Sequence, residues 1–83
     1  MLRLMIVDDE QIIREALSSM IDYTSLGYEV IATAKNGMEA YDRIRDDYPD
    51  VVITDIKMPI LNGLELIERA SRIDSRITFI LLS

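Results

Sequence analysis

The stretch VVITDIKMP (residues 51–59) decides how this chain folds. Residues 51–54 are β-formers without polar alternation, which predicts a strand buried on both faces, as in a parallel sheet. The run ends at a carboxylate, Asp55, and Pro59 favours a loop there because proline has no N–H for the ladder of a sheet. In open parallel sheets, ligands bind where strands end at their carboxyl ends. We therefore expect Asp55 at the mouth of a crevice, although an aspartate at a strand end is also a common turn former.

Length and composition limit the class of protein. With 83 residues, of which 49% are hydrophobic, the chain is long enough for one small globular domain. No apolar run approaches the roughly 20 residues that cross a bilayer. The chain has no cysteine, so disulfides and thiolate metal sites are excluded. These features favour a cytoplasmic protein without a membrane segment.

The charge balance limits partners and chemistry. Nine basic against 15 acidic residues give a net charge of −6, which opposes direct nucleic-acid binding by this segment. There is no histidine, so the commonest general base and metal ligand is missing. Any chemistry must therefore rest on carboxylates, hydroxyls and the backbone.

The remaining sequence alternates between strand and helix patterns. The first helix is predicted with Asp9 as its N-cap, and Asn36 and Asn62 are expected to open the second and third helices. Such βαβαβαβ alternation predicts parallel strands, right-handed crossovers and helices on both faces, an α/β doubly wound sheet. The expected strands span residues 2–7, 28–33, 51–55 and 76–82, and the apolar stripe of the first helix comprises Ile13, Ala16, Leu17, Met20 and Ile21.

Acidic residues follow two of these strands. The first strand ends at Asp8 and Asp9, and the third ends at Asp55. If the two strands are neighbours, their ends lie about 5 Å apart and the side chains converge. Carboxylates that close cannot all stay ionised unless a proton is held or a cation binds. All-oxygen ligands with room for water favour Mg²⁺.

A metal-bound aspartate at a strand end can act as a nucleophile towards phosphorus. The expected roles are Asp55 as attacking carboxylate, Asp9 as metal ligand and Asp8 as the second acid at the ion. The backbone carbonyl of Lys57 can complete the coordination, while its side chain is expected in solvent. Simpler roles exist for two acids: Asp9 as a helix cap and Glu10 as a charge that complements the helix dipole.

Several motifs together resemble the receiver domain of two-component response regulators. They are VDDE at residues 7–10, NG at 36–37, DIKMP at 55–59 and the glycine at 63. The resemblance covers the whole chain, and the long connection at 22–28 is similar to that of receivers in AraC-type regulators. It implies that residues 1–83 are the N-terminal part of a flavodoxin-like (CheY-like) three-layer domain, incomplete with four strands in the order 2-1-3-4 and three helices.

The resemblance also implies a function for the site. Asp55 would accept a phosphoryl group from a sensor histidine kinase or a small phosphodonor. Asp8, Asp9, Asp55 and the Lys57 carbonyl match the family's Mg²⁺ site, and Ser83 falls where the family's switch hydroxyl ends the fourth strand. The chain would then be a phosphoacceptor rather than an enzyme, and it would regulate transcription through an output domain outside this segment.

The sequence departs from the family pattern after the fourth strand. Receiver domains have five strands and five helices, and a lysine at the end of the fifth strand contacts the phosphate. With four strands, residues 78–82 should form an unpaired apolar edge, which natural sheets avoid. We therefore expect self-association into a dimer or higher oligomer.

Two other functions are compatible with the residues. The segment could serve only as an assembly or folding unit whose acid site is idle. Alternatively, it could be a Mg²⁺-dependent phosphatase with an aspartate nucleophile. The haloacid dehalogenase-like pattern places another aspartate two residues after the nucleophile, and here that position is Lys57.

Overall fold

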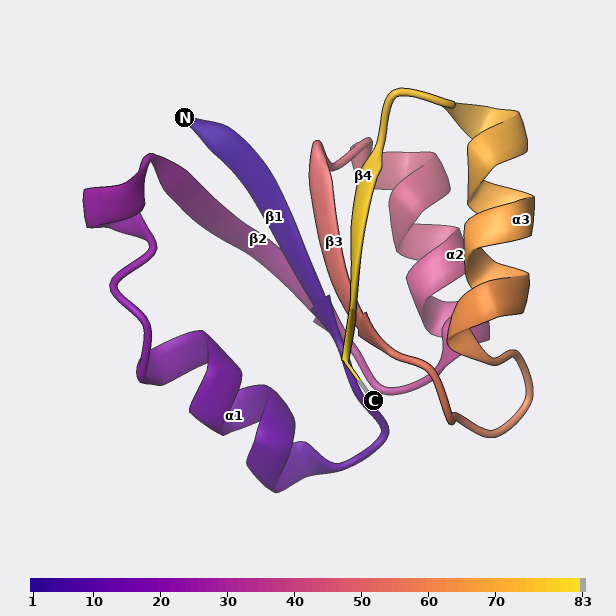
Figure 1. The fold of residues 1–83 in the computed structure, drawn as a ribbon, viewed down its shortest axis with the longest axis horizontal. Helices are drawn as coiled ribbons and strands as arrows, with labels where there is room; N and C mark the ends of the chain where they lie inside the picture. The colour runs from indigo at the N-terminus through magenta and orange to yellow at the C-terminus, as the bar shows by residue number, and fades with distance from the viewer. Residues whose placement is uncertain (83) are drawn as a thin grey trace.

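The computed structural model describes residues 1–82, which form one parallel sheet with helices on both faces (Figure 1). The strand order β2-β1-β3-β4 and the three helices confirm the predicted doubly wound fold. None of the helices in residues 1–82 is long and apolar enough to cross a membrane. The elements are β1 (Leu2–Val7), α1 (Gln11–Ser19), the 3₁₀ turn η1 (Thr24–Leu26), β2 (Tyr28–Ala34), α2 (Gly37–Asp47), β3 (Val51–Asp55), α3 (Gly63–Ile73) and β4 (Thr78–Leu82).

The core lies on both faces of the sheet, as the continuous apolar strands predict. Successive residues of β1 alternate: Leu4 and Ile6 belong to the cluster on the α1 face, and Met5 and Val7 belong to the cluster under α2 and α3. The second cluster is the larger and includes the fully buried Leu66 of α3. Burial on both faces fixes the position of β1 at the centre of the sheet.

The prediction for α1 was partly wrong. The helix ends at Ser19, Met20 is 80% exposed and Ile21 is 40% exposed, so the expected apolar stripe does not continue into the core. Tyr23 occupies this region instead: it is buried, and its hydroxyl donates to the carbonyl of Leu17 at 2.7 Å. The buried ring thus connects the segment after α1 to the helix through a hydrogen bond.

The predicted cap of α1 was also wrong. The N-cap residue is Glu10, and no side chain caps the helix. The carboxylate of Asp8 accepts the N–H of Glu10 at 2.9 Å, so the preceding acid closes the turn. The Asp9 carboxylate is therefore not used as a cap.

The other two helix starts agree with the sequence. Asn36 accepts the N–H of Glu39 at 2.8 Å. Asn62 and Glu65 form a reciprocal capping box, with N···O distances of 2.9 and 3.2 Å. Each cap satisfies backbone donors that a helix leaves free at its first turn.

The glycines after these two asparagines do more than permit a turn. A Cβ on Gly37 would overlap the backbone carbonyl oxygen of Leu61, and a Cβ on Gly63 would lie 2.5 Å from the carbonyl oxygen of Asp55. Both helix starts therefore pack directly against the end of β3 or the loop that follows it. Sequence reasoning assigned Asn62-Gly63 only a turn and helix start.

We expect Gly37→Ala to lower the free energy of unfolding by about 1–3 kcal/mol, the usual cost of overpacking. Alanine normally stabilises a helix relative to glycine by up to about 1 kcal/mol, so the expected sign is opposite to helix propensity. Urea unfolding measures the difference. Ser71→Ala, at an exposed position of α3, is the control and should stay within about 0.5 kcal/mol. A Gly37→Ala protein as stable as the parent would contradict the close packing against Leu61.

Candidate functional site

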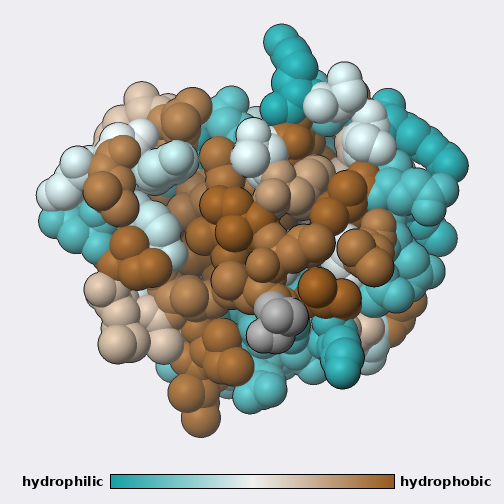
Figure 2. Space-filling view, viewed as in Figure 1, coloured by the Kyte–Doolittle hydropathy of each residue, from teal (hydrophilic) through white to brown (hydrophobic). Residues whose placement is uncertain are grey.

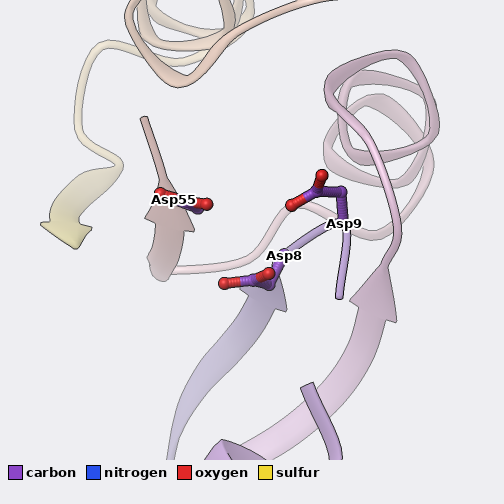
Figure 3. Close-up of side chains that lie close together, drawn as sticks. All are labelled: Asp8, Asp9 and Asp55. Carbon is purple, nitrogen blue, oxygen red and sulfur yellow. The ribbon is translucent and has the colours of Figure 1, made fainter. Parts of the chain in front are cut away.

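Three carboxylates meet at the carboxyl edge of the sheet. β1 and β3 are parallel neighbours with Val7 opposite Thr54, so the two strands end at the same level. One carboxylate oxygen from each of Asp8, Asp9 and Asp55 lies within 4.8 Å of the others. Figure 3 shows the three side chains pointing into a common space at the ends of β1 and β3. The predicted convergence of these acids is confirmed.

The three acids differ in burial, and this sets their electrostatics. Asp8 is 3% exposed, Asp55 is half-buried and Asp9 is exposed. Burial raises the pKa of Asp8; the hydrogen bond from Glu10 opposes this rise, and the negative charges of Asp55 and Asp9 add to it. A small cation between the carboxylates would offset both the cost of burying the charge of Asp8 and the repulsion among the three acids. An all-oxygen donor set fits a hard divalent ion.

The backbone holds Asp55 firmly at the end of β3. The N–H of Ile56 donates to the carbonyl of Leu82 at 3.2 Å, and the N–H of Gly63 donates to the carbonyl of Ile56 at 2.8 Å. The hydroxyl of Thr54 donates to the carbonyl of Asp55 at 2.9 Å. Asp55 therefore lies between a hydrogen-bonded strand and a loop whose two ends are joined by the hydrogen bond from Gly63 to Ile56.

The loop at 56–62 is anchored by two buried side chains and has a strained backbone at one residue. Met58 and Leu61 are buried in the core under α2 and α3. Between them, Ile60 has φ 72°, in the left-handed region, which costs a non-glycine residue roughly 1–2 kcal/mol. Lys57 is exposed at the start of this loop, two residues after Asp55. The role of its carbonyl stays a prediction, and Ser83 lies outside the described residues.

Arg14 is a neighbour of the site that sequence reasoning missed. Its guanidinium Nη1 donates to the backbone carbonyl of Asp8 at 2.7 Å. The side chain runs from α1 back to the end of β1, six residues earlier in the chain. Helical periodicity gives the direction of a Cβ atom but not the reach of a long side chain, so the pattern contained no signal for this contact.

Residues 4–83 match the family described as the response regulator receiver domain. The chain belongs to this family. The receiver is 43% identical over 83 residues to the uncharacterized transcriptional regulatory protein YesN of Bacillus subtilis, and the match covers all of the chain and 23% of YesN. It thus spans about a quarter of the length of that relative.

Solved structures give the same result. A two component transcriptional regulator AraC from Clostridium phytofermentans is 31% identical with a TM-score of 0.90, and the match covers 98% of the receiver and 65% of that chain. The CheX-CheY-BeF3-Mg complex from Borrelia burgdorferi is 29% identical with a TM-score of 0.85 and coverages of 96% and 60%. The CheY-like fold and the likeness to AraC-type receivers are confirmed.

Membership of the family settles the class of function. Receiver domains of transcriptional regulators are signalling modules rather than enzymes, so the phosphatase alternative is set aside. Such domains bind Mg²⁺ at an aspartate cluster and are phosphorylated by sensor histidine kinases. Asp8, Asp9 and Asp55 form such a cluster in this receiver.

We expect Asp8→Asn to stabilise the receiver in EDTA at pH 7, by up to about 1 kcal/mol, the scale of a pair of charges on neighbouring strands. The raised pKa of Asp8 means that the folded state holds its proton more tightly than the unfolded chain does. The parent should therefore lose stability as the pH rises above the ordinary value of 3.8, and the variant should lose less. Asparagine can still accept the N–H of Glu10.

Urea unfolding at several pH values in EDTA measures both effects. Asp46→Asn removes one negative charge from an exposed position of α2 and should leave the pH dependence unchanged. An Asp8→Asn protein that unfolds at lower urea concentration than the parent at pH 7 would contradict the repulsion.

Proposed function

We propose that residues 1–83 are the N-terminal part of the phosphoacceptor module of a two-component transcriptional regulator. Asp55 accepts the phosphoryl group of a sensor histidine kinase, with Mg²⁺ held by Asp8, Asp9 and Asp55. The observation that carries this proposal is the convergence of three carboxylate oxygens within 4.8 Å at the ends of two neighbouring strands. The spans of 65% and 60% on the solved receiver chains support the assignment to one part of a domain.

The three acids of the site differ in burial and in the strand from which they come. The buried Asp8 and the exposed Asp9 would hold the ion from the β1 side, Asp55 would hold it from β3, and the Lys57 carbonyl would complete the set. Mg²⁺, when bound, neutralises the charge that builds up between a carboxylate and a phosphoryl group. Water would supply the remaining ligands, as is usual for Mg²⁺ in proteins.

Phosphoryl transfer then needs only one nucleophile. An oxygen of Asp55 forms a bond to phosphorus while the P–N bond to the kinase histidine breaks. The electron pair of that bond leaves with the imidazole nitrogen, which takes up a proton from solvent. The half-buried position of Asp55 leaves an oxygen accessible, and the firm backbone around it supplies the positioning on which such transfers depend.

Three further assignments follow from the family. Ser83 would act as the switch hydroxyl that contacts the phosphoryl group. The output is transcription, through a domain other than this acidic segment, whose charge of −6 is unfavourable for nucleic acid. The setting is the cytoplasm, where response regulators typically act.

The phosphoacceptor proposal predicts Mg²⁺-dependent binding of beryllofluoride, which mimics a phosphoryl group on a carboxylate. The BeF3-Mg complex of the Borrelia CheY supports this choice of probe. We expect NMR shifts around Asp55 only when both Mg²⁺ and beryllofluoride are present, and at least a tenfold loss of affinity in Asp55→Asn and Asp9→Asn.

Asp46→Asn is the matched control, because it removes an exposed acid from α2 without touching the site. Its affinity should equal that of the parent. Absence of beryllofluoride binding by the folded parent would reject the phosphoacceptor role and leave the idle-site alternative.

We further propose that the 83-residue polypeptide self-associates through β4. Among residues 1–82, β4 pairs only with β3, so its other edge is free. Ile80 is 46% and Leu82 36% exposed. Figure 2 shows apolar side chains gathered over the region that Figure 1 gives to β1 and β4. An apolar edge strand pairs readily with a second copy of itself, which commits the proposal to a homo-oligomer.

Ile80→Lys should shift the polypeptide towards the monomer, because a charge on the edge strand opposes pairing. Sedimentation velocity at micromolar concentration measures the shift. Ile12→Lys, at an 80% exposed position of α1, adds the same charge away from β4 and should leave the oligomer intact. A parent that sediments as a monomer under these conditions would refute self-association.

A further inference from the structure

Arg14 holds the peptide unit that joins the two acids of β1. Its Nη1 donates to the carbonyl oxygen of Asp8 at 2.7 Å, and its own N–H donates to the carbonyl of Glu10 at 3.0 Å. Arg14 is half-buried, in the first turn of α1. The side chain and the helix start therefore enclose the turn that carries Asp8 and Asp9.

Asp8 is held at three points. Its N–H donates to the carbonyl of Ala34 at 3.1 Å, its carboxylate accepts the N–H of Glu10 at 2.9 Å, and its carbonyl accepts Arg14. The first two contacts fix the Asp8 residue itself. Only the third acts on the carbonyl of the planar peptide between Asp8 and Asp9.

Asp9 depends on that peptide for its position. Its residue is exposed, and its carboxylate does not cap α1. Because the peptide unit is planar, holding the Asp8 carbonyl also fixes the direction of the Asp9 N–Cα bond. The contact from Arg14 thus fixes where the Asp9 backbone leaves β1, which limits where the Asp9 carboxylate can lie relative to Asp55.

We propose that Arg14 is a positioning residue of the metal site, which holds Asp9 and Asp8 in the geometry that Mg²⁺ requires. The proposal rests on the Mg²⁺ site of the proposed function. Mg²⁺ demands near-ideal octahedral geometry, whereas Ca²⁺ accepts flexible coordination. Loss of the contact should therefore weaken Mg²⁺ more than Ca²⁺.

The charge of Arg14 has the opposite effect on the metal. A guanidinium near the acids repels a divalent cation, so a purely electrostatic role predicts tighter Mg²⁺ binding when the arginine is removed. Among the ion pairs of residues 1–82, none involves Arg14, so the contact to Asp8 is not secondary to a carboxylate pair. The sign of the change in affinity separates positioning from charge.

The test is titration of the 83-residue protein with MgCl₂ or CaCl₂, followed by NMR, in the parent and in Arg14→Ala, Arg14→Gln and Arg14→Lys. We expect the Mg²⁺ dissociation constant of Arg14→Ala to rise about tenfold, as is typical when a group that orients a ligand is lost. The Ca²⁺ constant should rise less. Arg14→Lys keeps a donor and the charge and should recover part of the Mg²⁺ affinity.

Arg72→Ala is the control for net charge. Arg72 is exposed near the end of α3 distant from Asp55 and pairs with Glu68, so its loss should leave the Mg²⁺ constant unchanged. If Arg14→Ala does not fold, Arg14→Gln decides: weaker Mg²⁺ binding supports the proposal.

Two outcomes overturn the positioning role alone. One is tighter Mg²⁺ binding in Arg14→Ala or Arg14→Gln, which assigns the effect to charge. The other is an unchanged Mg²⁺ constant with a lower urea midpoint, which assigns Arg14 to the stability of α1. A folded parent that binds no Mg²⁺ would instead overturn the proposed function and, with it, this inference.

Discussion

The parallel pairing of β1 with β3 is the constraint on which the rest of this receiver depends. The two strands are in register from Leu4 opposite Val51 to Val7 opposite Thr54, so their carboxyl ends emerge together. Both strands are packed on both faces, and a shift by one residue would exchange their core faces. The apolar core therefore fixes the register, and the register brings together acids that repel one another. The cluster is sustained by packing several residues away from it.

Close packing and hydrogen bonding hold the two sides of the site differently. On the β3 side, Gly63 lies against the carbonyl of Asp55, and Gly37 lies against Leu61 in the loop that follows. These contacts leave no room for a side chain, so on the Asp55 side close packing adds to the hydrogen bonds around the end of β3. The β1 side is defined by directional polar contacts, from Glu10 to the Asp8 carboxylate and from Arg14 to the Asp8 carbonyl.

Patterns with a short range in sequence predicted most of this fold, and contacts between distant elements account for what they missed. Continuous apolar runs gave the buried strands β1 and β3, whereas the apolar run of β4 is largely exposed, and Asn36 gave a helix start that its own side chain caps. The extent of α1 was mispredicted because the helix ends at Ser19 and Tyr23, rather than Met20 or Ile21, is buried after it. The acids at the strand ends followed from topology. Their unequal burial, with Asp8 buried and Asp9 exposed, could not be predicted from the sequence. Two adjacent aspartates do not indicate which side chain points into the protein.

The unequal cover of the two sheet faces explains why polar contacts define the β1 side. Under α2 and α3 the core is continuous, and Met58 and Leu61 extend it beneath the loop after Asp55. On the other face α1 stands alone, and an apolar hollow of about 220 Å³ remains beside Tyr23 and Ile80. At the turn between β1 and α1, Asp8 accepts hydrogen bonds from Glu10 and Arg14. The turn that carries Asp8 and Asp9 is thus held by directional polar contacts, whereas Asp55 is held by close packing in addition to hydrogen bonds.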